Sequence, residues 1–205
     1  MLAAKARAAG GQSGGNAPVE FVDFIALANQ GSDASRTLTI SSGLSAGDVV
    51  IAMTANRTNT PPALASGYTD ILSGNNDGLN RSLRLQYKVV SGSSESITWT
   101  GSYGFMVALR NFRSIGQSEV TNSITPGINS TANIPIPAIS GLDTTGVGYL
   151  LAGTYFSNLM TAVSGPYTLG SSTYAYIEEN TSASYSQENF TNPTTTYVSW
   201  VVEIL

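Results

Sequence analysis

The sequence holds few residues that could carry catalytic chemistry. None of its 205 residues is a cysteine or a histidine, which excludes a thiol nucleophile, a Ser/His/Asp relay, a disulfide and a metal site with His or Cys ligands. Carboxylates remain as candidate acids and bases, but the 13 Asp and Glu residues are scattered along the chain. A carboxylate-dependent glycosidase would need two of them in contrasting surroundings. The sequence therefore predicts a protein without catalytic residues, metal or cofactor.

The composition favours strands joined by turns. Hydrophobic residues make up 41% of the chain, charged residues only 11%, and 21 glycines accompany long stretches of Ser, Thr and Asn. A β-sandwich often uses roughly 200 residues as one domain, so this length fits a single sandwich. No apolar run approaches the roughly 20 residues that span a bilayer, and we expect no membrane insertion.

The first 18 residues differ in composition from the rest of the chain. An Ala-rich basic segment with Leu2, Lys5 and Arg7 leads into a Gly/Ser-rich stretch over residues 10–16, which is a linker composition. We expect residues 1–18 to form a docking arm, extended or partly helical when bound; for the isolated protein the alternative is a disordered tail. The segment lacks the apolar core of a signal peptide, so we expect it to be retained.

From Glu20 onward, apolar and polar side chains follow a period of two. In the first half the strand-like segments lie at residues 20–26, 37–40, 48–53, 82–90, 96–100 and 105–109. Short β-branched segments bounded by Gly, Asn, Ser or Pro are typical of antiparallel strands with one buried face. We expect no helix after residue 20. Trp99 and Trp200 lie within apolar strand segments and are predicted to anchor the core.

The strand pattern runs through the chain twice. Residues 133–137, 141–142 and 146–152 echo residues 38–40, 43–44 and 47–52; residues 164–168 echo 66–69; residues 174–178 echo 83–87; and residues 198–202 echo 105–109. The order holds over five elements at offsets of 91 to 99 residues. This conserved order and spacing predicts two pseudo-repeats, at about residues 20–113 and 114–205.

Such a duplication has two structural outcomes. Each copy can close as its own small sandwich, or the copies can interleave into one jelly-roll-like antiparallel β-sandwich over residues 19–205. We favour the single sandwich, because five or six strands in each half would leave exposed edges that a merged sandwich pairs. Pro135 and Pro137 at alternate positions place their strand at a sheet edge, since proline cannot donate a ladder hydrogen bond.

The charges are divided unequally along the chain. All nine Lys and Arg residues lie between Lys5 and Arg113, whereas residues 114–205 carry six acidic residues and no basic ones. Either this is drift on a solvated surface, or a basic arm meets an acidic partner while the acidic half projects into solvent. A pI near 4.6 provides no basic surface for phosphates, so we expect no nucleic-acid partner.

Aromatic residues are concentrated in the second half. Tyr155, Phe156 and Tyr185 lie among polar residues and are the candidates for a surface patch on which sugar rings could stack. Ordinary cross-strand aromatic packing is the alternative explanation for them.

Several strands and turns also resemble a known class of proteins. Residues 47–52, 67–69, 85–90, 97–100 and 108–110 resemble the β-sandwich modules of tailed-bacteriophage virion proteins, such as tail-fibre, baseplate and head-decoration components. The similarity covers most of residues 20–205, and its motifs are framework strands and turns, so no functional residue can be transferred.

The resemblance implies a structural protein of the virion, assembled in the host cytoplasm and present as a homo-oligomer. Its partners would be other virion proteins of the capsid, tail or baseplate, and Leu2, Lys5 and Arg7 of the arm would make the attachment. The alternative function is a carbohydrate-binding module or host-recognition adhesin, which would bind a host-surface glycan through Tyr155, Phe156 and Tyr185.

Overall fold

The structure is a computed structural model that describes residues 17–27, 30–76, 80–122, 133–155, 162–170, 174–191 and 198–205. In these residues every regular element is a β-strand and every strand pair is antiparallel. The prediction of an all-β, antiparallel fold is therefore confirmed. In the same residues no helix is long and apolar enough to cross a membrane. Leu2, Lys5 and Arg7 of the predicted arm lie outside the described residues.

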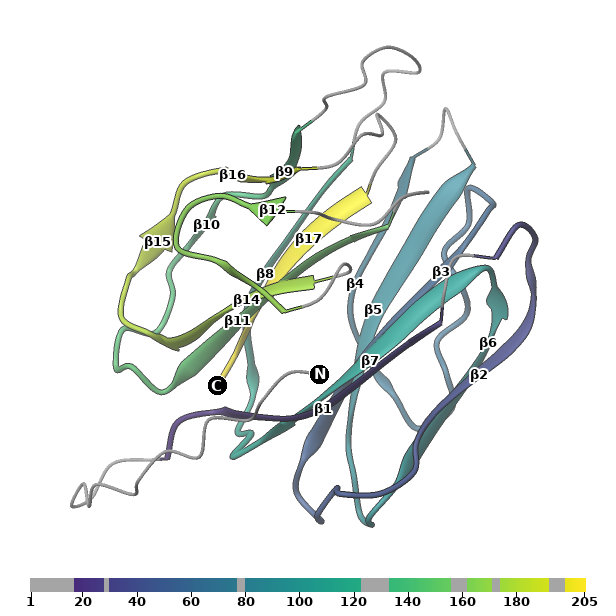
Figure 1. Ribbon diagram of the computed structural model, residues 1–205, viewed down its shortest axis with the longest axis horizontal. Helices are drawn as coiled ribbons and strands as arrows, with labels where there is room; N and C mark the ends of the chain where they lie inside the picture. The colour runs from purple at the N-terminus through teal and green to yellow at the C-terminus, as the bar shows by residue number, and fades with distance from the viewer. Residues whose placement is uncertain are drawn as a thin grey trace.

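The first half of the chain forms two sheets (Figure 1). The larger is five-stranded, in the order β1 (Glu20–Leu27), β7 (Tyr103–Arg110), β3 (Val49–Asn56), β5 (Arg81–Val89) and β4 (Thr69–Asn76). The smaller pairs β2 (Ala34–Ile40) with β6 (Glu95–Gly101). Every residue of the central strand β3 is buried, because the small sheet covers one face of the large sheet and the second half of the chain covers the other.

The second half forms one five-stranded sheet and two smaller ones. The larger has the order β13 (Thr168–Leu169), β14 (Tyr174–Asn180), β11 (Gly148–Tyr155), β17 (Val198–Ile204) and β8 (Ile115–Asn122). The smaller sheets are β12 (Ala162–Val163), β16 (Glu188–Thr191) and β9 (Asn133–Ile136), and β10 (Ile139–Ser140) with β15 (Ser184–Tyr185). Pro135 lies in β9 at the edge of its sheet, as predicted.

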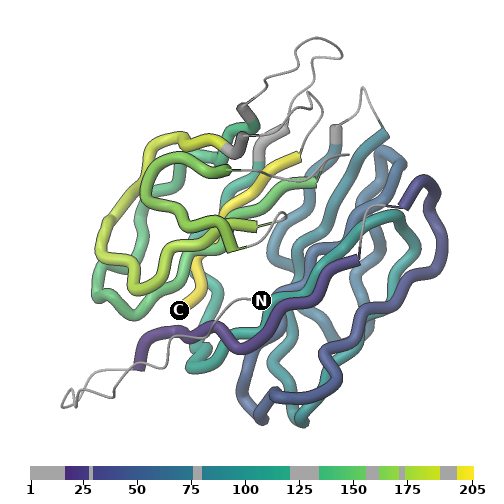
Figure 2. The backbone as a smooth tube through the Cα atoms, in the orientation of Figure 1, coloured from purple at the N-terminus to yellow at the C-terminus, as the bar shows by residue number. Residues whose placement is uncertain are grey.

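The sheets stack in layers, with the two five-stranded sheets facing each other in the middle (Figure 1). A central core lies between these sheets and combines residues of both halves. A second core lies between the first large sheet and β2–β6, and a third between the second large sheet and the small sheets of its own half. Figure 2 shows the first half of the chain on one side of the molecule and the second half on the other.

The two halves do not exchange strands between their large sheets. The order β1-β7-β3-β5-β4 in the first half corresponds to β8-β17-β11-β14-β13 in the second. The first strand of each half pairs with the last strand of that same half, which completes each large sheet without strands from the other half. The arrangement thus differs from the interleaved sandwich that we favoured on sequence. The halves are joined by side-chain packing instead.

Trp200 lies at the centre of the packing between the large sheets. Its indole is fully buried and lies 6.0 Å from the Phe105 ring, between centroids. The indole N–H donates a hydrogen bond to Met53 Sδ at 3.4 Å, so residues of both halves meet at this ring. Trp99, a residue of β6 in the core between the first large sheet and β2–β6, is 5% exposed. Both tryptophans are core residues, as predicted.

We expect Gly153→Ala to destabilise the protein. Gly153 lies opposite Trp200 in the β11–β17 ladder, and a Cβ atom there would overlap the indole ring. Overpacking of this kind costs about 1–3 kcal/mol. Gly92→Ala is the matched control, because no atom lies within 4 Å of a Cβ atom placed there. Chemical denaturation measures the free energy of unfolding of both variants. Equal values for the two would contradict the tight packing around Trp200.

Candidate functional site

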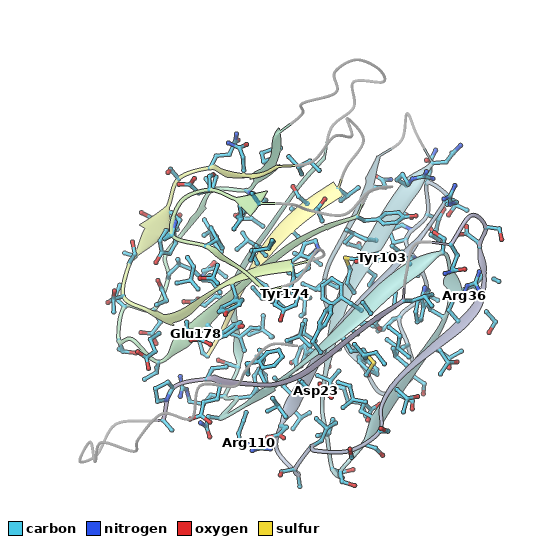
Figure 3. All side chains as sticks on the ribbon, viewed as in Figure 1. Asp23, Arg36, Tyr103, Arg110, Tyr174 and Glu178 are labelled. Atoms are coloured by element: carbon cyan, nitrogen blue, oxygen red, sulfur yellow. The ribbon has the colours of Figure 1, made fainter. Side chains whose placement is uncertain are left out.

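Tyr155 does not lie on the surface, and the sequence-based placement is wrong. The side chain is fully buried at the end of β11. Its hydroxyl oxygen lies 2.8 Å from Ser102 Oγ, and the two hydroxyl groups share a hydrogen bond. Its ring stacks on Tyr103, with centroids 5.8 Å apart, and Figure 3 shows Tyr103 in the region between the two large sheets. Burial raises the pKa of the Tyr155 hydroxyl. The polar neighbours in sequence suggested exposure, but the other half of the chain covers the residue.

Tyr185 does not join Tyr155 in a surface patch. Tyr185 is half-buried on β15, with its hydroxyl donating to Asn180 Oδ1 at 2.8 Å. Its ring packs against Tyr167, with centroids 6.1 Å apart. Phe156 lies outside the described residues. A role of Tyr185 and Phe156 in glycan binding stays a prediction.

Asp48 and Arg110 form an ion pair in the first half, and the Asp48 side chain is only 3% exposed. The guanidinium of Arg110 donates to both carboxylate oxygens, at 2.9 and 2.8 Å, and Ser45 N donates at 2.8 Å. The hydrogen bonds from Arg110 hold the pKa of Asp48 below its ordinary value, although burial acts in the opposite direction. The pair joins the turn before β3 to the end of β7, so its role is to stabilise the fold.

Glu203 has a comparable position in the second half. It is 2% exposed, on β17, and accepts hydrogen bonds from the backbone N–H groups of Asp143 at 2.6 Å and Gln117 at 3.1 Å. A buried carboxylate is stabilised by such backbone donors. Here the carboxylate links the loop before β11 and the start of β8 to β17 of the second large sheet, so it too stabilises the fold.

A third polar cluster lies on the outer side of the first half. Lys88 Nζ lies 2.9 Å from Glu95 Oε1, and the Tyr68 hydroxyl donates to the same oxygen at 3.5 Å. Burial and the adjacent carboxylate raise the pKa of Tyr68. The cluster joins β5 to β6. Across the described residues, no three carboxylates come close enough to hold a metal ion.

A groove lies along β6 on the described surface. It has a cavity volume of about 630 Å³, within the usual range for ligand sites. One wall is β6 and the neighbouring part of β2, and the other is the connection between β3 and β4. The lining residues are Asp33, Ser35, Asn56, Thr58, Thr60, Pro61, Pro62, Ala63, Leu64, Ala65, Ser66, Thr98, Trp99 and Thr100.

The wall opposite β6 is anchored to the large sheet by side chains of β5. Arg84 Nε donates to the Pro62 carbonyl at 2.7 Å, and Ala65 N donates to Gln86 Oε1 at 2.8 Å. Gln86 is itself buried and bonds to Thr54 Oγ1 at 3.2 Å. These contacts hold residues 61–66 against the large sheet and away from β6.

The remaining polar groups of the groove are mostly engaged within the protein. The Asp33 carboxylate accepts the Arg57 N–H at 2.9 Å, and Asn56 Nδ2 donates to the Thr60 carbonyl at 2.9 Å. Trp99 contributes a buried indole whose N–H has no hydrogen-bond partner among the described residues. The exposed lining consists largely of hydroxyl and apolar groups, which suit binding rather than acid-base chemistry.

The sequence analysis did not identify this groove. Its signals are the adjacent Pro61 and Pro62 in a connection between strands and the outward Thr98 and Thr100 of β6. These residues form a groove only because the fold places the connection between β3 and β4 beside the edge of β6. Comparison of the chain with protein-family models, with curated proteins and with solved structures gave no match.

We expect Asp48→Asn to lower stability at neutral pH by about 1–2 kcal/mol, because a charged hydrogen-bond acceptor is lost. The lowered pKa of Asp48 means that its contribution is complete above the ordinary value of 3.8 and is lost as the pH falls further. The difference between variant and parent should therefore narrow below that pH. Denaturant titrations at pH 7 and pH 3 measure it.

Asp70→Asn is the matched control for this prediction. Its partner Arg84 also donates to a carboxylate, but the Asp70 side chain is 45% exposed, and exposed pairs contribute less than about 1 kcal/mol. A loss for Asp70→Asn as large as that for Asp48→Asn would contradict the importance of the enclosed pair.

Proposed function

We propose that the protein is a non-enzymatic structural component of a tailed-bacteriophage particle, of the tail-fibre, baseplate or capsid-decoration type, present in several copies. The single observation that supports this proposal most is that the chain's buried polar groups connect strands and loops of the fold. Asp48, Glu203 and Tyr155 all join framework elements, and the groove along β6 is lined mainly by hydroxyl and apolar groups. The strands that resemble phage modules, including residues 85–90 and 97–100, are parts of this same framework.

The start of the described chain suits an attached arm. The carbonyl of Ala17 accepts from Arg113 Nη1 at 3.1 Å, and that of Pro18 accepts from Asn111 Nδ2 at 2.8 Å. Val19 is buried, and its N–H donates to the Val147 carbonyl at 3.0 Å. Figure 2 shows β1 continuing from this point along the first half. An arm that ends here joins the body at a fixed position, held by both halves, and Leu2, Lys5 and Arg7 would bind the particle.

The two halves are also proposed to be copies of one strand unit. In the register of the central strands, Leu85, Met53 and Phe105 form a row across the first large sheet. The corresponding row in the second sheet is Tyr174, Gly153 and Trp200. With Met53 and Gly153 taken as equivalent, Phe105 and Trp200 are equivalent as well, and their rings lie 6.0 Å apart in the central core. Contact between equivalent residues is typical of an isologous, two-fold interface.

The turns support the same proposal. Each half has three glycines with positive φ at matching places in its loops: Gly43 (90°), Gly47 (95°) and Gly67 (79°) in the first, and Gly141 (74°), Gly146 (77°) and Gly165 (70°) in the second. Glycine adopts this left-handed conformation without the steric cost that a Cβ atom imposes. Matching turns joined to a matching strand order are what a duplicated and fused unit would retain.

We expect a protein lacking residues 2–16 to fold but to be absent from particles of the phage that encodes it. The deletion leaves Ala17, Pro18 and their hydrogen bonds in place. Mass spectrometry of purified particles measures incorporation, and thermal unfolding of the isolated protein checks the fold. The double variant Lys5→Glu, Arg7→Glu tests the basic charge of the arm without shortening it.

Normal incorporation of the truncated protein would contradict attachment through the arm. Absence of the full-length protein from the particle would contradict the virion assignment itself. A glycan array probed with the full-length protein tests the carbohydrate-binding alternative.

A further inference from the structure

The outer sheets of the two halves differ at one edge. In the second half, β12 pairs with β16, and β16 pairs in turn with β9. In the first half, the corresponding sheet contains only β2 and β6, so within the described residues no strand pairs with the second edge of β6. An unpaired edge presents backbone N–H and C=O groups to any chain that can add to it.

The ladders identify β6 as the counterpart of β15 and β16. Strands β9 and β10 pair with β16 and β15 in one continuous register, from Asn133 opposite Thr191 to Ser140 opposite Ser184. β2 pairs with β6 in the same antiparallel manner, along the outer side of its own large sheet. The free edge of β6 therefore corresponds to the edge that β12 occupies in the second half.

The chain has a counterpart of β12 in the first half, but it does not pair there. Both connections end in a similar turn, Ser66-Gly67-Tyr68 in the first half and Ser164-Gly165-Pro166-Tyr167 in the second. The two residues before the serine are Ala162–Val163, which form β12, and Leu64–Ala65, which form no strand. Leu64 is instead 46% exposed.

The connection between β3 and β4 does not pair with β6 because its backbone groups are hydrogen-bonded to side chains of β5. Pro61 and Pro62 have no N–H to donate. The Pro62 carbonyl and the Ala65 N–H are taken by Arg84 and Gln86 of β5. The groove of about 630 Å³ opens between this displaced connection and β6, at Thr98, Trp99 and Thr100.

We propose that this groove is a docking site for an extended polypeptide segment of a partner protein, which adds to β6 as β12 adds to β16. In such strand addition, main-chain hydrogen bonds provide the affinity and alternate side chains provide the specificity. The inference is independent of the assignment to a phage particle, because it rests on the comparison of the two halves.

The lining defines the chemistry of the segment. Its exposed polar groups are mainly the hydroxyls of Thr58, Thr60, Thr98 and Thr100, and the Asp33 carboxylate is already bonded to the Arg57 N–H. An uncharged segment with small or β-branched side chains fits these walls, as Ala162 and Val163 do in the second half. Proline is excluded from positions that must donate to β6.

The experiment uses the full-length protein and a fluorescent peptide that copies residues 157–165, which include β12. Fluorescence anisotropy should show saturable binding, and hydrogen exchange should show new protection of backbone amides of β6. Ala63→Trp places a large ring on an exposed lining position and should weaken binding by about tenfold or more. Ala46→Trp, at an exposed alanine outside the groove lining, should bind as the parent does.

A peptide with Ala162→Pro is the second control, and it should bind more weakly because it lacks one N–H donor. In β12 the N–H groups of alternate residues face β16, as the N–H of Ser164 does when it donates to the Asn189 carbonyl, and Ala162 is one of these residues. Thermal unfolding of both tryptophan variants confirms that they are folded. No binding at millimolar peptide, binding without protection of β6, or equal binding by Ala63→Trp would each overturn the proposal. Binding of a glycan that is lost in Ala63→Trp, with no peptide binding, would overturn it in favour of a saccharide site.

Discussion

The face-to-face packing of the two five-stranded sheets is the constraint on which the rest of the structure depends. Trp200 lies at its centre, against Phe105 and Met53 of the other half. Because each large sheet is covered on both faces, its central strands are buried along their whole length, as in β3 and β11. Sheets covered on both faces favour near-continuous apolar strands rather than strict alternation. The small outer sheets, β2–β6 among them, keep the alternating pattern.

This layering decides where polar groups can lie. Charged side chains cannot enter the central core without partners, so Asp48 and Glu203 lie at strand ends, where Arg110 and backbone N–H groups satisfy them. The acidic residues that are buried therefore stabilise loops. Differences between the halves collect in the outer layers, where one half pairs its connection with β16 and the other binds its connection to β5 and leaves a groove.

The positions of most strands and of both core tryptophans could be predicted from residue pattern, because apolar periodicity reports burial directly. The match of residues 174–178 with residues 83–87 stays a prediction. A shift of two residues keeps every side chain on the same face, so a pattern of period two cannot fix the register between the halves. The groove was missed altogether, because its walls come from segments over 20 residues apart.

By itself, the sequence determined the all-β class and the absence of His and Cys chemistry, and it predicted a repetition of strand order, which stays a proposal. These follow from residue types and from local periodicity, which need no knowledge of neighbours. Only the tertiary structure decided that the two halves keep the strands of their large sheets separate, that Tyr155 is covered by the opposite half, and that β6 has a free edge within the described residues. Each of these depends on which surfaces meet across long chain separations, and a period of two says which side of a strand is buried without saying what buries it.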